Sequence, residues 1–169
     1  PALMEWLSSP IIYRQHDVGI LPLKTLAQSA FLPHSASHHY LSMAKNDVNK
    51  LVENRDNKKK KYLHMFRALL ATQWVIDKGT QPPMRFQDLV NAFLPSGDIR
   101  EQLDDLLNLK SQSQESEFIS AQEDLDEYLL RLYARLESKL PAQITAIRAE
   151  DCDQCLHDTL FAVWPDIKL

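Results

Sequence analysis

The densest group of chemically active side chains lies between Asn57 and Arg67, where the sequence reads NKKKKYLHMFR. In a helix with about 100° per residue, Lys60, His64 and Arg67 fall within about 60° of one another and form one cationic stripe. The macrodipole of such a helix disfavours each lysine in its first turn by ~0.3–1 kcal/mol. An anion held at this end would offset that repulsion, so the stripe predicts a phosphate-binding surface. The alternative is an ordinary solvated lysine face.

Two other groups contain residue types that bind metal ions. His34, His38 and His39 fall within six residues, but His38 and His39 point about 100° apart on one helix and cannot share a metal. The segment Cys152–His157 has the pattern C-x-x-C-x-H, yet a zinc site needs four ligands and the sequence holds no second pair. We therefore predict no metal site, and we favour a hydrogen-bonded His39 near the basic helix.

The Asp-x-Asp spacing of Asp124 and Asp126 also occurs in carboxylate pairs that hold two magnesium ions. Such pairs lie on a strand, where residues i and i+2 share a face, whereas on a helix these two point about 160° apart. Arg131, Arg135 and Lys139 follow toward the end of the same helix and complement its macrodipole. We therefore interpret the acidic group as structural. No Ser/His/Asp or Cys/His set stands out, so we predict no catalytic residue and no independent catalysis.

The elements that must position these residues are helices. Only 3 of 169 residues are glycine, which leaves no room for a glycine-rich phosphate loop or a nucleophile elbow. Leucine and alanine together outnumber valine, isoleucine and threonine two to one, which favours helices. We predict an all-α, multi-helix bundle of about six to eight helices, with Phe66, Leu70 and Trp74 in its core. The expected helices cover residues 2–8, 22–31, 35–54, 58–78, 86–93, 98–110, 120–140 and 151–164.

The chain is predicted to form one helical domain over residues 1–169, with a helical core at 1–110, a polar loop at 111–119 and C-terminal helices at 120–169.

The net charge is unevenly spread along the chain, with +5 for residues 1–84 and −9 for residues 85–169. This difference indicates an anionic partner for the first half, or it is ordinary variation along a chain. The sequence has no apolar run of 18 residues, no signal segment and only two cysteines, so we expect no membrane span and a cytoplasmic location. It begins with Pro1 rather than Met, and we expect a piece of a longer protein.

Four stretches in order carry a resemblance to a known family. They are EWLSSPIIY (Glu5 to Tyr13), HHYLSMAKND (His38 to Asp47), KKYLHMFRALLATQWV (Lys60 to Val75) and PPMRF (Pro82 to Phe86). Together they resemble the predicted bacterial nucleotidyltransferases of the RNA-repair-associated DNA-polymerase-β-like family, which includes the YcgL-type proteins. The match covers roughly Pro1 to Phe93 and is less diagnostic in the acidic second half.

The resemblance implies an N-terminal catalytic domain with a Gly-Ser motif and an Asp-x-Asp pair that holds Mg²⁺ for nucleotidyl transfer. This chain has no Gly-Ser dipeptide, so it resembles the helical C-terminal portion, with the catalytic domain upstream. Mg²⁺ and a nucleoside triphosphate are then cofactors of the full-length enzyme, and none is expected on this chain alone. Trp6, Ile11, Ile12 and Tyr13 are the expected apolar surface left bare by the missing domain.

In similar polymerase-β-like enzymes a helical domain supplies a lysine and an aromatic or hydroxyl group to the triphosphate. The resemblance therefore implies a helical nucleotide-binding domain of an enzyme that transfers a nucleotide to an acceptor, with RNA as one candidate acceptor. The matching triphosphate- or RNA-binding candidates are Lys60, Lys61, Tyr62, His64, Arg67 and His39. The alternative is a non-catalytic helical module that binds RNA or a protein partner, including a second copy in a homodimer.

Overall fold

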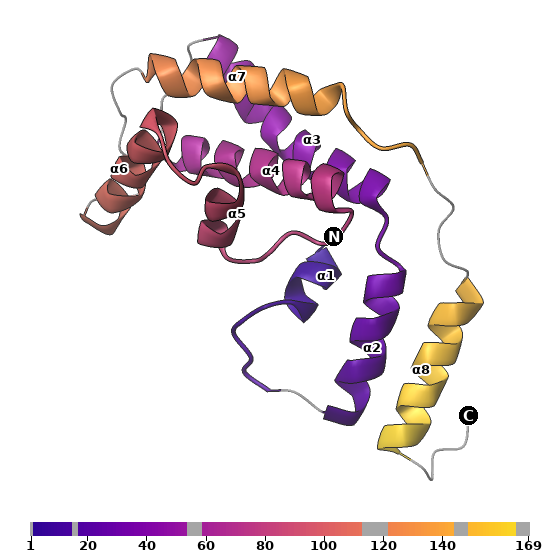
Figure 1. Ribbon diagram of the computed structural model, residues 1–169. Helices are drawn as coiled ribbons and strands as arrows, with labels where there is room; N and C mark the ends of the chain where they lie inside the picture. Colours follow the sequence, from indigo (N-terminus) through magenta and orange to yellow (C-terminus); the bar gives the residue numbers. More distant parts are fainter. Residues whose placement is uncertain (1, 15–16, 54–58, 113–121, 144–148, 165–169) are drawn as a thin grey trace. The chain divides into compact units, whose positions relative to one another are not determined.

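The computed structural model describes residues 2–14, 17–53, 59–112, 122–143 and 149–164, and within these ranges every regular element is an α-helix (Figure 1). The predicted all-α class is therefore confirmed. The helices are α1 (Ala2–Leu7), α2 (Asp17–Ser29), α3 (Pro33–Val52), α4 (Lys59–Lys78), α5 (Phe86–Phe93), α6 (Asp98–Gln112), α7 (Glu123–Glu137) and α8 (Ala149–Val163).

The chain divides into two compact units, where the sequence suggests one domain. Unit 1 comprises Pro1–Leu32 and Gln143–Leu169, and unit 2 comprises Pro33–Ala142. In unit 1, α8 packs against α2. Gly19 permits this contact, because a Cβ built there would lie 3.2 Å from the Thr159 Cγ2 atom. The two ends of the chain therefore pair with each other instead of extending the bundle of unit 2.

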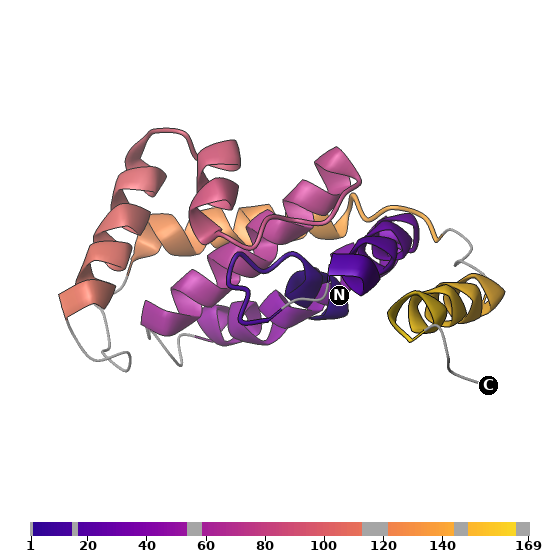
Figure 2. The ribbon, with the colours of Figure 1, turned by 90° about the horizontal axis from the view of Figure 1, so that it is seen from below.

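Unit 2 is organised around α4, which packs against α3, α5, α6 and α7. Helices α3 and α4 lie side by side (Figure 1 and Figure 2). The face of α4 that meets its neighbours is fully buried at Tyr62, Phe66 and Leu70. The predicted leucine stripe of α7 is buried from Leu125 to Leu136. An apolar stripe with a period near 3.6 residues is what such a bundle requires.

Trp74 departs from the predicted core. Phe66 and Leu70 have no exposed surface, but Trp74 is only half-buried. Its indole Nε1 donates to the Thr80 hydroxyl oxygen at 3.1 Å, and its ring meets Phe93 edge-on with 6.3 Å between centroids. A tryptophan in this position keeps its polar edge near water, which is a common arrangement for an indole.

Two prolines explain the helix boundaries that differ from expectation. Helix α2 begins at Asp17 and contains Pro22, which we expected at the start of the helix. Helix α3 begins at Pro33, two residues before the expected start at residue 35. Proline suits the first helical position because its fixed φ is helical and its missing N–H has no intrahelical partner there. Ser35 is therefore inside α3 and does not cap it.

The boundaries in the second half differ by a few residues. Helix α6 runs to Gln112, two residues into the predicted loop that starts at Ser111. Helix α7 begins at Glu123, with Gln122 at its N-cap and no side-chain cap hydrogen bond. The start predicted at residue 120 lies outside the described residues. Just after the end of α4, Gly79 adopts a φ of 65°, the left-handed conformation that glycine commonly supplies past the end of a helix.

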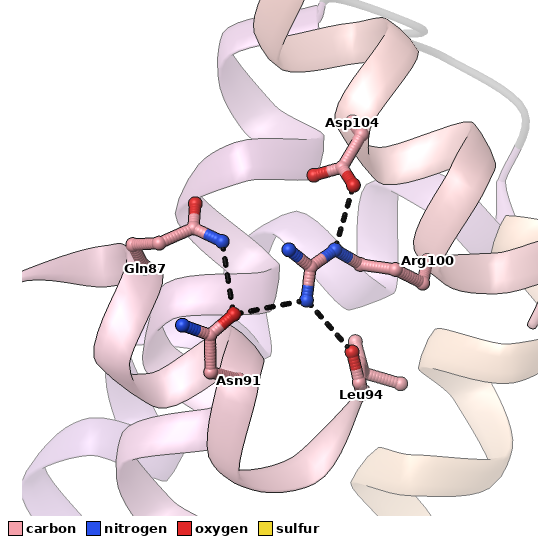
Figure 3. A network of polar contacts seen from close by, with 5 residues as sticks. All are labelled: Gln87, Asn91, Leu94, Arg100 and Asp104. Carbon is pink, nitrogen blue, oxygen red and sulfur yellow. Dashed lines mark hydrogen bonds and ion pairs between the residues drawn. The ribbon is translucent and has the colours of Figure 1, made fainter. Parts of the chain in front are cut away.

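A polar network joins α5 to α6 (Figure 3). Arg100 donates from Nε to Asp104 Oδ2 at 2.7 Å, and from Nη1 to the Leu94 carbonyl oxygen at 2.9 Å. The same Nη1 donates to Asn91 Oδ1 at 3.1 Å, which also accepts from Gln87 Nε2 at 3.0 Å. One guanidinium therefore closes the turn between the two helices, because its planar fork bonds the carbonyl of Leu94, the residue just after α5, and a carboxylate of α6.

Candidate phosphate-binding site

The lysine run becomes the start of α4, as the sequence predicts. Lys60 is exposed and Lys61 is half-buried. Each makes a polar or electrostatic interaction within the protein. No acidic residue lies in the first turn of this helix. The cations therefore stay at the positive end of the macrodipole, where an anion is stabilised.

A contact between α3 and α4 shows that the two helices run antiparallel. The His64 Nδ1 and Asp47 Oδ2 atoms are 2.9 Å apart, and since a carboxylate only accepts, Nδ1 carries the hydrogen. The last turns of α3 thus lie beside the first turns of α4. Lys50, one turn beyond Asp47, reaches the same end of the helix pair as Lys60 and Lys61. We call these three lysines the basic end.

Lys50 is a residue that reasoning from the sequence did not select. Its one local indication is its place in the last turn of α3, where a cation complements the helix macrodipole. Nothing in the spacing between positions 50 and 60 indicates that they lie at the same end of a helix pair. That placement follows from the antiparallel packing of α3 against α4.

Two members of the predicted cationic stripe hold the fold together. His64 joins α4 to α3 through Asp47. Arg67 donates from Nη1 to the Met84 carbonyl oxygen at 3.0 Å, in the connection between α4 and α5. Within the stripe, His64 and Arg67 therefore make contacts that hold helices and connections together, whereas Lys60 at the start of the helix remains a candidate phosphate ligand.

Tyr62 lies in the interior of unit 2. Its side chain has no exposed surface, and its hydroxyl donates a hydrogen bond to Asp126 Oδ1 on α7. Burial raises the pKa of Tyr62, and the bond to Asp126 raises it further. Burial also raises the pKa of Asp126, whereas the bond from Tyr62 lowers it. This position favours a structural role for Tyr62 over the expected contact with a triphosphate.

The two carboxylates of the Asp-x-Asp pair on α7 have different hydrogen-bond partners. Asp126 accepts from Tyr62, while Asp124 Oδ2 accepts from Gln102 Nε2 of α6 at 3.2 Å. Across the part of the chain that the structure describes, no three His, Cys, Asp or Glu side chains are placed to hold a metal ion.

Helix α7 brings negative charge to the basic end. The Tyr62–Asp126 bond joins early residues of both helices, and Arg135 Nη2 donates to Gln73 Oε1 at 3.1 Å further along both, so α4 and α7 run parallel. The acidic first turn of α7, which includes Glu123, thus lies near the first turns of α4. These carboxylates would repel a phosphate group bound at the basic end.

His39 lies away from the basic end. It is exposed on α3, and its ring meets Tyr40 edge-on with 5.4 Å between centroids. Eleven residues of helix separate it from Lys50, which is about 16 Å along the axis. The structure therefore does not bring His39 together with Lys60 and Lys61.

The fold and the basic end define an all-α protein with a candidate anion site on an antiparallel helix pair. Within the described ranges, no helix has both the length and the apolar character to cross a membrane. A model of the RNA repair pathway DNA polymerase beta family (RlaP) matches residues 1–158. The chain therefore belongs to this family, and the resemblance noted in the sequence is confirmed at that level.

A curated relative is similar over nearly the whole chain. It is the uncharacterized protein YcgL of Bacillus subtilis (strain 168), 29% identical over 169 residues. The match covers 98% of this chain and 65% of YcgL, so the chain spans less than two thirds of that relative. No solved structure matches the chain.

Proposed function

We propose that this chain is the helical, nucleotide-binding portion of a cytoplasmic nucleotidyltransferase, with the basic end as its phosphate contact. The observation that carries the proposal is that Lys50, Lys60 and Lys61 lie at the same end of two packed helices, both inside the family match. Lysine is a compact point charge that can neutralise a triphosphate during nucleotidyl transfer. Membership in a DNA polymerase beta family supports a nucleoside triphosphate as the ligand.

The transfer step itself is assigned to a further catalytic domain of a longer polypeptide. The relative YcgL extends well beyond the region that this chain matches, which supports such a domain. We propose no metal-dependent step for this chain. Its proposed role is to bind and orient the triphosphate, while RNA, in keeping with the family's description, is the proposed acceptor.

The test is a titration of ATP followed by amide chemical shifts, which suits the weak binding expected of a partial site. Lys60→Ala with Lys61→Ala should weaken ATP binding ~10-fold or more, since a hydrogen bond to a charged group contributes about 1.5–3 kcal/mol. The matched control is Lys78→Ala with Lys139→Ala, which removes the same charge from two exposed lysines elsewhere in unit 2. Equal ATP affinities for the two double variants would contradict the proposal.

A short RNA oligonucleotide separates this function from the alternative of an RNA-binding module. RNA binding through phosphates has a steep salt dependence and little preference among nucleotides. A triphosphate site instead prefers ATP over AMP at fixed ionic strength. Tight RNA binding without any preference for ATP over AMP would favour the RNA-binding module.

A further inference from the structure

Unit 1 contains an open groove of about 680 Å³. Its walls come from α1, residues 9–14, α2 and α8, all within this unit. Trp6 and Tyr13 line it and are 76% and 97% exposed, and Ile11 and Ile12 beside them are also exposed. The expected bare apolar surface is thus present. A cluster of large exposed apolar side chains of this kind marks an interaction site.

The charged residues of the groove indicate the charge of the surface that would bind there. Among the described residues that line it, the charged side chains are Arg14 and Lys24, and both are cationic. A complementary partner therefore offers an apolar anchor flanked by carboxylates. A symmetric pairing of two copies would place the same patch against itself, so the cations of the groove would meet their own counterparts. This arrangement disfavours a second copy of the chain.

We propose that this groove docks the further domain of the same polypeptide, and this inference rests on the proposed function. The match with YcgL covers 98% of this chain, so it includes most of the residues that line the groove. The remaining 35% of YcgL lies outside the match and is long enough to form a further domain. A tethered domain also needs little intrinsic affinity, because a short linker supplies an effective concentration in the millimolar range. The occupant is thus an acidic-flanked apolar surface of the catalytic domain.

Hydrogen exchange compares residues 1–169 alone with the longer polypeptide. Backbone amides of residues 3–14 should exchange at least roughly tenfold more slowly in the longer polypeptide, because docking protects them from opening. Trp6→Glu should abolish that protection, and Tyr13→Glu should repeat the effect from a second position. The matched control is Leu156→Glu on α8, which changes a side chain that is 60% exposed and does not line the groove.

Three outcomes would overturn the proposal. One is equal exchange of residues 3–14 in the two proteins. Another is protection within residues 1–169 alone that increases with concentration, which identifies a second copy as the occupant. The third is a gene whose product has no residues beyond these 169. The nucleotide role is tested separately at Lys60 and Lys61, so its failure with groove protection intact would leave the docking site standing.

Discussion

Tyr62→Phe is the most informative single change in unit 2. It removes one hydroxyl from a side chain with no exposed surface and leaves the ring in place. Asp126, half-buried on α7, then loses the donor that joins it to α4. The substitution therefore isolates one hydrogen bond between two packed helices.

The expected cost follows from the state of Asp126. A hydrogen bond to an ionised group contributes about 1.5–3 kcal/mol, and a neutral bond about 0.5–1.5 kcal/mol. Because Asp126 is only half-buried, solvent screens part of the loss and the lower end of the charged range applies. We expect Tyr62→Phe to lower the free energy of unfolding by about 1.5–2 kcal/mol near neutral pH.

The cost should depend on pH. Burial raises the pKa of Asp126 above its ordinary value, so its contribution to stability is largest below the unfolded pKa and falls as pH rises through the folded pKa. The bond from Tyr62 lowers that pKa, so without it the pKa of Asp126 rises further. The difference between wild type and variant is therefore small below about pH 4, the region of the unfolded pKa, and grows toward neutral pH.

Urea unfolding at several pH values measures this difference, with the fluorescence of Trp74 as the probe of unit 2. Trp6→Phe and Trp164→Phe in the background remove the two tryptophans of unit 1. The matched control is Tyr133→Phe, whose hydroxyl donates to Glu137 at 3.2 Å on an exposed helix face and should matter by less than about 0.5 kcal/mol. Equal losses for both variants, or a loss that does not change with pH, would refute the reasoning.

Two further changes test packing within single units. Arg100→Lys should lower the free energy of unfolding of unit 2 by about 1–3 kcal/mol, because an ammonium cannot reach the Leu94 carbonyl and Asp104 together. An unchanged urea midpoint would show that the network does not stabilise unit 2. Gly19→Val should cost about 1–3 kcal/mol by forcing α2 away from Thr159. Faster hydrogen exchange in α8 is the expected readout, and an unchanged rate would show that the two helices can adjust.

Helix positions were predictable where the local pattern has one physical meaning. Helix α5 lies at the predicted 86–93. Helix α4 ends at the predicted residue 78, and the next residue, Gly79, has a positive φ that suits glycine. Proline has two meanings, since it can end one helix or open the next. Pro22 lies inside α2, so the predicted start of that helix was wrong, and Pro33 opens α3, two residues before the predicted start at residue 35. The choice depends on packing beyond the local sequence.

The same limit applies to the candidate site. The sequence placed Lys60, Tyr62 and His64 in one helix, but not the partners that determine what each side chain does. Tyr62 turns to Asp126 and His64 to Asp47, at separations of 64 and 17 residues. The neighbour that sequence reasoning missed, Lys50, comes from the antiparallel helix. Spacing along one helix predicts a shared face, whereas the partner on that face comes from tertiary packing.

The uneven charge of the chain has a source of compensation inside the fold. The sequence indicated that a positive first half meets an anion, and the parallel packing of α4 and α7 brings the acidic first turn of α7 to the basic end. The acidic first turn of α7 is thus one source of negative charge near the basic end, and a bound phosphate is the second source that we propose. A carboxylate near the basic end should repel a bound phosphate, so Glu123→Gln should tighten the binding of phosphate there. A ligand that binds elsewhere would be indifferent to that change, because solvent and salt screen exposed charges beyond about 10 Å.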